Sequence, residues 1–124
     1  MKGFKDLIVY QKAFALAMDI FEITKKFPKE ETYSLIDQIR RSSCSVCGCI
    51  AESYRKRKYP AHFVSKLTDA DMENSETAVW IDFSFACTYI TQKDHNLLME
   101  RNEEVGRLPG DRSSTRKNFF KQRI

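Results

Sequence analysis

The sequence lacks the features of a membrane or secreted protein. No uninterrupted apolar run approaches the ~20 residues that a membrane-spanning helix needs. The first residues, MKGFKDLIVYQKAF, place Asp6, Gln11 and Lys12 in or beside the apolar positions, whereas a secretory signal has a basic head followed by an apolar run. We therefore expect a cytoplasmic protein without a membrane partner.

The sequence also lacks a residue pattern that specifies a reaction. Neither His62 nor His95 follows a glutamate by three residues, so the Glu-x-x-His pairs of carboxylate di-iron bundles are absent. Asp69, Glu73 and Glu76 share one helical face, but such a face is usually solvated. We expect no catalytic residue, no cofactor and no enzymatic activity. A small hydrolase is the remote alternative, for which no nucleophile and base can be named.

Cysteine is scarce and unevenly placed. Three of the four cysteines lie close together, at Cys44, Cys47 and Cys49, which favours reduced thiols packed as small apolar groups over a disulfide framework. Their CxxCxC spacing is also that of some metal motifs. On a helix, however, Cys49 lies more than about 130° around the axis from the other two, so the three thiolates cannot bind one ion. We therefore expect no metal site.

What the sequence does contain is apolar residues at helical spacing. Residues 6–27 carry two apolar stripes, which together cover roughly half of a helix, more than the ~100° of an ordinary surface helix. One stripe consists of Leu7, Tyr10, Phe14, Ala17 and Phe21. We predict that the other forms a contact between subunits, the alternative being a central helix in a monomer; its residues are Val9, Ala13, Leu16, Ile20, Ile23 and Phe27.

Residues 34–59 are predicted to form the helix around which the others pack. Pro28 and Pro60 should separate this helix from its neighbours, because proline disfavours helical geometry in the residue before it. Its apolar positions recur every three or four residues. Between them stand small side chains that allow neighbouring helices to approach closely: Ser42, Ser43, Ser45, Gly48 and Ser53.

Two further helices are predicted, from residue 61 to 89 and from about 94 to 108. The apolar stripe of the first is interrupted by Asp71, Asn74, Ser75 and Asp82. Arg40 or Arg41 is one candidate partner for such polar groups, which would face the interior or a subunit boundary. Four helices joined by short links predict an all-α, antiparallel up-and-down four-helix bundle over residues 1–108. Residues 109–124 form a basic tail without a clear period, which we expect to be mobile or irregular.

Basic residues supply the candidate functional surface. Arg41 and Arg55 are two heptads apart and return to nearly the same side of a helix. We expect the cluster to bind RNA or DNA backbone without base readout. In an oligomer the cluster would be repeated in every subunit, so that several weak phosphate contacts would add to a useful affinity. One alternative is a favourable end for the helix dipole; another is a scaffold that recruits a different protein. The cluster consists of Arg40, Arg41, Arg55, Lys56, Arg57 and Lys58.

Three blocks of the sequence, FKDLIVYQKA, FPKEE and QIRRSSCSVCGCIAES, resemble a bacterial family. The chain is similar, from about residue 4 to 108, to the four-helix-bundle proteins associated with intervening sequences in large-subunit ribosomal RNA genes. It also resembles the accessory variability proteins of diversity-generating retroelements. The matching positions are Phe4, Asp6, Leu7, Gln11, Lys12, Ala13, Gln38, Ile39, Arg40, Arg41, Ser45, Ile50, Ala51 and Glu52.

This resemblance implies a four-helix bundle that assembles as a ring-shaped homopentamer. The retroelement relatives further imply that nucleic acid is a partner. The chain departs from the family pattern at Cys47, Cys49 and Ser53, in a helix where the family often has proline, asparagine and glycine.

Overall fold

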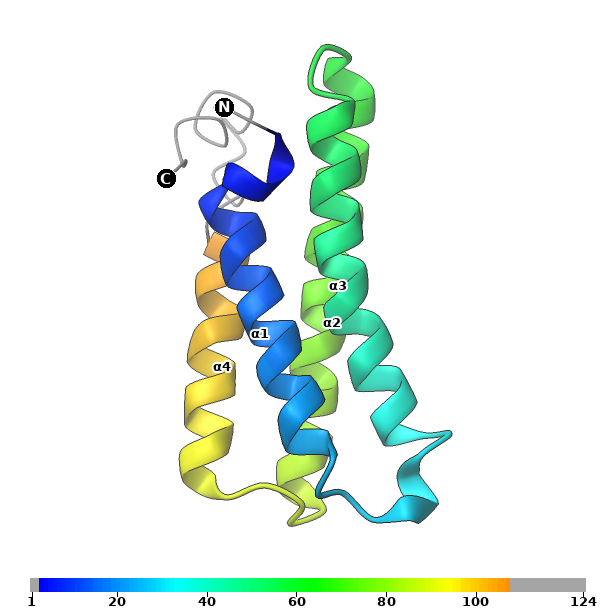
Figure 1. The fold of residues 1–124 in the computed structure, drawn as a ribbon, viewed down its shortest axis with the longest axis vertical. Coiled ribbons are helices and arrows are strands. Elements are labelled where there is room, and N and C mark those ends of the chain that lie inside the picture. Colours follow the sequence, from blue (N-terminus) through cyan, green and yellow to red (C-terminus); the bar gives the residue numbers. More distant parts are fainter. Residues whose placement is uncertain (1–2, 108–124) are drawn as a thin grey trace.

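The structure is a computed structural model that describes residues 3–107. In this range the elements are η1 (Phe4–Asp6), α1 (Ile8–Thr24), η2 (Lys29–Glu31), α2 (Leu35–Arg55), α3 (Pro60–Ala86) and α4 (Gln92–Arg107). Successive α-helices run in opposite directions (Figure 1), and each packs against the next, with α4 returning to α1. The predicted all-α four-helix bundle is confirmed. The basic tail predicted at 109–124 lies outside the described residues.

Local sequence sets the helix boundaries. After α1 ends, the amides of residues 25–27 bond to carbonyl groups three residues back, and Pro28 follows. Pro60 begins α3, where its fixed φ suits the first helical position and its missing N–H would have no intrahelical partner. Before α4, Thr91 Oγ1 accepts from the amide of Asp94 at 3.1 Å, and the Asp94 carboxylate accepts from the amide of Thr91 at 3.4 Å. This reciprocal capping box starts α4.

The core consists of two apolar clusters stacked along the bundle. Burial of each large apolar side chain contributes roughly 1.5–3 kcal/mol relative to exposure, so these clusters are the main source of stability. The cluster toward η1 contains Leu7, Val9, Ala13, Val46, Ile50, Phe63, Leu67, Ala70 and Val105. The cluster toward η2 contains Leu16, Ile20, Phe27, Leu35, Ile36, Ile39, Ile81, Ile90 and Leu98.

A polar layer lies between the two clusters. Asn74 Nδ2 donates to the carbonyl of Asn102 at 2.9 Å, and Asn102 Nδ2 donates to the carbonyl and Oδ1 of Asn74 at 2.8 and 3.0 Å. Thr77 Oγ1 donates to Ser42 Oγ at 2.8 Å. All four side chains are buried. The layer therefore ties α3 to α4 and to α2 while leaving these polar groups paired.

The predicted arginine partners of Asn74 and Asp82 are wrong. Asn74 is buried as expected, but it pairs with another asparagine. Asp82 is exposed, and its Oδ1 lies 2.8 Å from His95 Nε2. Arg40 and Arg41 bond to groups outside α3, because their side chains lie toward α1 and along α2.

The subunit interface predicted on the first helix is also wrong. Val9, Ala13, Leu16, Ile20 and Phe27 are buried within one chain, with at most 6% of any side chain exposed, and Ile23 packs against the same core. The physical reason is that α1 lies between α2 and α4, which together cover this stripe. The other stripe is only partly covered: Leu7 and Ala17 are buried, whereas Phe14 and Phe21 are 51 and 40% exposed. Met18, which lies one turn from each of these two rings, is 44% exposed.

Breaking the asparagine pair tests the polar layer. We expect Asn102→Leu to lower the free energy of unfolding by about 1–3 kcal/mol, because it leaves the Asn74 Oδ1 buried without a donor. The double variant Asn74→Leu/Asn102→Leu should lower the free energy of unfolding by less than the sum of the two single variants, since no side-chain amide is then left without a partner. Urea denaturation of the three variants measures these differences. Strict additivity would contradict the pairing.

Candidate nucleic-acid interface

The six predicted cations do not form one patch. Arg40 and Arg41 lie in the first half of α2, whereas Arg55 ends that helix. At 1.5 Å per residue, residues 41 and 55 are about 21 Å apart along the axis. A shared side of the helix therefore does not bring the two groups together.

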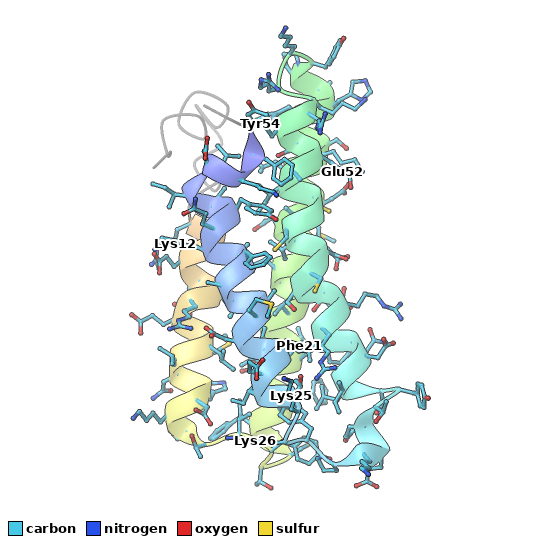
Figure 2. All side chains as sticks on the ribbon, viewed as in Figure 1. Lys12, Phe21, Lys25, Lys26, Glu52 and Tyr54 are labelled. Atoms are coloured by element: carbon cyan, nitrogen blue, oxygen red, sulfur yellow. The ribbon has the colours of Figure 1, made fainter. Side chains whose placement is uncertain are left out.

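The side chain of Arg40 links α2 to α1 and stabilises the fold. Its Nε donates to Thr24 Oγ1 at 2.8 Å, and its Nη2 donates to the carbonyl of Phe21 at 3.2 Å. The guanidinium also lies 4.4 Å from the centroid of the Phe21 ring, at the lower end of α1 in Figure 2. Arg40 thus satisfies groups near the C-terminal end of α1. Arg40 is therefore a weaker candidate for the interface, because two of its nitrogens and one face of its guanidinium already contact protein.

Arg41 is a surface residue. Its Nη2 lies 2.8 Å from Asp37 Oδ2, one helical turn earlier, and both side chains are well exposed. An exposed pair at this spacing contributes little to stability. It also neutralises the Arg41 charge locally, so this end of α2 is a weaker candidate for binding an anion.

The other four cations form what we call the basic tip: Arg55, Lys56, Arg57 and Lys58. Figure 1 shows that the α2–α3 hairpin projects past the ends of α1 and α4, and these residues occupy the projecting turn. The sequence has no aspartate or glutamate from residue 53 to 68. The flanking acids, Glu52 and Asp69, both lie near Lys66 Nζ, at 2.8 and 3.8 Å. These two acids therefore pair with Lys66 rather than with the basic tip, although Asp6 of η1 lies beside Arg55 and Arg57.

Aromatic side chains accompany the basic tip. Tyr59 is 60% exposed, and its ring lies 6.3 Å from that of His62. Tyr54 points from α2 toward the N-terminal segment in Figure 2. The guanidinium carbon of Arg57 lies 4.1 Å from the Tyr54 ring centroid, a cation–π stack. Basic and aromatic side chains together are typical of surfaces that bind nucleic acid.

An open hollow of about 610 Å³ lies between η1 and the end of α2. Lys5 contributes a further cation there, which sequence reasoning missed because it lies far from the basic tip in the sequence. No local signal marks it; only the packing of η1 against α2 brings it there. The lining residues are Gly3, Phe4, Lys5, Asp6, Tyr54, Arg55 and Arg57.

Comparison with known proteins places the chain in a family. The family described as 23S rRNA-intervening sequence protein matches residues 5–110. The chain belongs to this family. Its fold is also similar to a crystal structure from Bacteroides thetaiotaomicron, a protein of unknown function from the S23 ribosomal protein family. The two share 26% sequence identity and a TM-score of 0.72, over 81% of this chain and 89% of that one. No curated protein matches the sequence.

The cysteines of this family member are free thiols. Cys44 and Cys87 are exposed, whereas Cys47 and Cys49 are half-buried. Among residues 3–107, no group of three or more histidine, cysteine, aspartate or glutamate side chains is arranged to hold a metal ion. Nor does this part of the chain contain a helix that is long and apolar enough to span a membrane.

Substitution of the two neighbouring arginines tests their different roles. We expect Arg40→Ala to lower the free energy of unfolding by about 1–2 kcal/mol, because Thr24 Oγ1 loses its donor and Phe21 loses its cover. Arg41→Ala, which removes only an exposed pair, should change it by less than about 0.5 kcal/mol. Urea denaturation compares the two, and equal effects would contradict the assignment of Arg40 to the fold.

Thiol alkylation tests the packing of α2. Burial, and secondarily the nearby Cys44, raises the pKa of Cys47 to about 11. At pH 8 only about a thousandth of this thiol is therefore ionised, and the thiolate is the reactive form. We expect iodoacetamide to modify Cys44 well before Cys47 in the folded protein, and the two at similar rates in urea. Mass spectrometry of timed digests measures the rates; rapid modification of Cys47 in the folded state would contradict its burial.

Proposed function

We propose that this protein is a non-enzymatic, homo-oligomeric helical bundle that binds nucleic-acid backbone without reading sequence. The observation that carries the proposal is the basic tip, four consecutive cations on a projecting turn with no acid between residues 53 and 68. Phosphates bind such a surface through charge and the release of counterions. Base readout requires side chains held in a groove at defined positions, and an exposed cation run does not provide them.

The family description supports RNA as the first ligand to test. It names the 23S rRNA-intervening sequence, and the basic tip carries the charge that an RNA backbone attracts. Both duplex DNA and structured RNA present phosphates at the surface, so backbone contact alone accommodates either.

Association of copies is proposed from two exposed apolar stripes. The α1 stripe consists of Phe14, Met18 and Phe21. The α3 stripe consists of Val64, Met72, Val79 and Phe83, which are 47–68% exposed and lie opposite the buried face of α3. Large apolar side chains that recur on the exposed face of a helix are candidates for a protein interface. Because the two stripes differ, pairing the α1 stripe of one copy with the α3 stripe of the next is a head-to-tail contact, and such contacts close into rings when the rotation permits.

A protein scaffold with no nucleic-acid role is the competing function. The observation in its favour is the same pair of apolar stripes, which another polypeptide could cover. A ligand that binds through phosphates loses affinity steeply as salt rises, whereas apolar contact with a protein does not.

Salt titration of nucleic-acid binding tests the basic tip. We expect the triple variant Arg55→Gln/Lys56→Gln/Lys58→Gln to weaken binding of structured RNA and duplex DNA by roughly tenfold or more at low salt, and to flatten the salt dependence. A matched control, Lys26→Gln/Lys29→Gln/Lys93→Gln, removes three exposed cations at the opposite end and should bind nearly as the wild type does. Absence of binding by the wild type even at low salt would reject the proposal.

Light scattering tests the association of copies. We expect the wild type to have a mass that is a multiple of the 14.5 kDa chain, and Phe14→Glu or Met72→Glu to reduce it. An equimolar mixture of the two variants should recover dimers, because each supplies the stripe that the other has lost. Asn96→Glu on α4 adds the same charge elsewhere and serves as the control. A monomeric wild type would contradict the proposed association.

A further inference from the structure

We infer that the hollow between η1 and the end of α2 receives an unstacked nucleobase, so that the basic tip binds single-stranded nucleic acid in preference to duplex. This inference rests on the proposed function and names the form of nucleic acid that it would take. The hollow and the basic tip share Arg55 and Arg57, so a strand that contacts the tip passes the mouth of the hollow.

The size of the hollow suits one nucleotide. Its volume of about 610 Å³ lies within the range of roughly 300–1,000 Å³ that is usual for sites that bind small molecules. Phe4 and Tyr54 supply apolar surface, and the hollow is partly open rather than an enclosed cavity. A base can therefore enter while its phosphates stay outside with the cations.

The Tyr54–Arg57 stack provides a planar surface for a base. Arg57 Nη1 donates to the carbonyl of Tyr54 at 3.1 Å, which holds the guanidinium in place over the ring at 4.1 Å. Unstacked bases commonly stack on aromatic rings and on the planes of arginine side chains. Because both residues line the hollow, a base that enters it lies beside this platform.

The charges around the hollow favour a phosphate at its mouth. Among the lining residues that the structure describes, Lys5, Arg55 and Arg57 are positive and Asp6 is the one acid. The carbonyl groups at the end of α2 would otherwise repel an anion. They accept hydrogen bonds from the amide of Lys56, and the Tyr54 carbonyl accepts from the amide and side chain of Arg57. The negative end of the helix is thus covered by groups of the site itself.

Duplex nucleic acid cannot use the hollow without losing a base pair. In a duplex the bases are stacked and paired, and moving one out requires unstacking energy that a single strand does not need. The phosphates of both forms can still contact the basic tip. The preference for single strands therefore comes from the hollow, and the salt-sensitive part of binding comes from the tip.

Three DNA probes of equal length separate these contributions: oligothymidine, an abasic strand with the same phosphates but no bases, and a duplex. We expect fluorescence anisotropy at low salt to give oligothymidine roughly tenfold tighter binding than the abasic strand, as stacking of a base would provide. The duplex should also bind more weakly than oligothymidine. Equal affinities for oligothymidine and the abasic strand would overturn the inference while leaving the proposed function intact. Failure of all three probes to bind would overturn both.

Two variants test whether the hollow causes the base-dependent part of the binding affinity. Arg57→Lys keeps the charge but removes the guanidinium plane, so we expect it to weaken the binding of oligothymidine severalfold more than the binding of the abasic strand. Lys58 belongs to the basic tip but lies outside the hollow. Lys58→Gln should therefore lower the affinity for all three probes by similar factors. Thermal melting of each variant checks that it is folded. An unchanged ratio of the oligothymidine and abasic affinities in Arg57→Lys would overturn the role of the Tyr54–Arg57 platform.

Discussion

The hydrogen-bonded layer between the two apolar clusters determines how the helices are aligned along the bundle axis. Apolar side chains tolerate sliding, because one leucine contact resembles another, whereas Asn74 and Asn102 each find their partners in one alignment only. Sliding by one turn would leave buried amides without partners. The Thr77–Ser42 bond extends the same constraint to α2. The position of every surface feature relative to the others depends on this alignment.

The basic tip is one consequence. Beyond this layer α2 continues for 13 residues, from Ser42 to Arg55, whereas α4 continues for only five, from Asn102 to Arg107. The turn that joins α2 to α3 therefore projects past the ends of α1 and α4 (Figure 1). η1 packs against the side of this projection and brings Lys5 near Arg55 and Arg57. The local run of cations supplies the charge, and the lengths and alignment of the helices place that charge on a projecting turn beside η1.

The helices themselves could be predicted from the sequence, because proline and apolar spacing act locally. Pro28 and Pro60 mark the breaks, and the four helices follow. The sequence could not show which stripe of α1 faces inward, because Val9, Leu16 and Ile20 are as apolar as Phe14 and Phe21. That choice depends on the positions of α2 and α4. Arg40 was misassigned for the same reason: its partners, Thr24 and the Phe21 carbonyl, lie on another helix. Only the four adjacent cations from Arg55 to Lys58 stay together, since chain connectivity alone keeps them close.

The projecting hairpin also gives the molecule a direction. Its cationic turn lies at one end of the bundle, whereas η2 and the α3–α4 connection lie at the other (Figure 1). Rotation about a cyclic axis keeps the same end of each subunit on the same side. Copies joined by the α1 and α3 stripes would thus carry all their basic tips on one face of the oligomer, as a ring of positive charge. A nucleic-acid strand would bind on that face, and the opposite face would be left for a different partner.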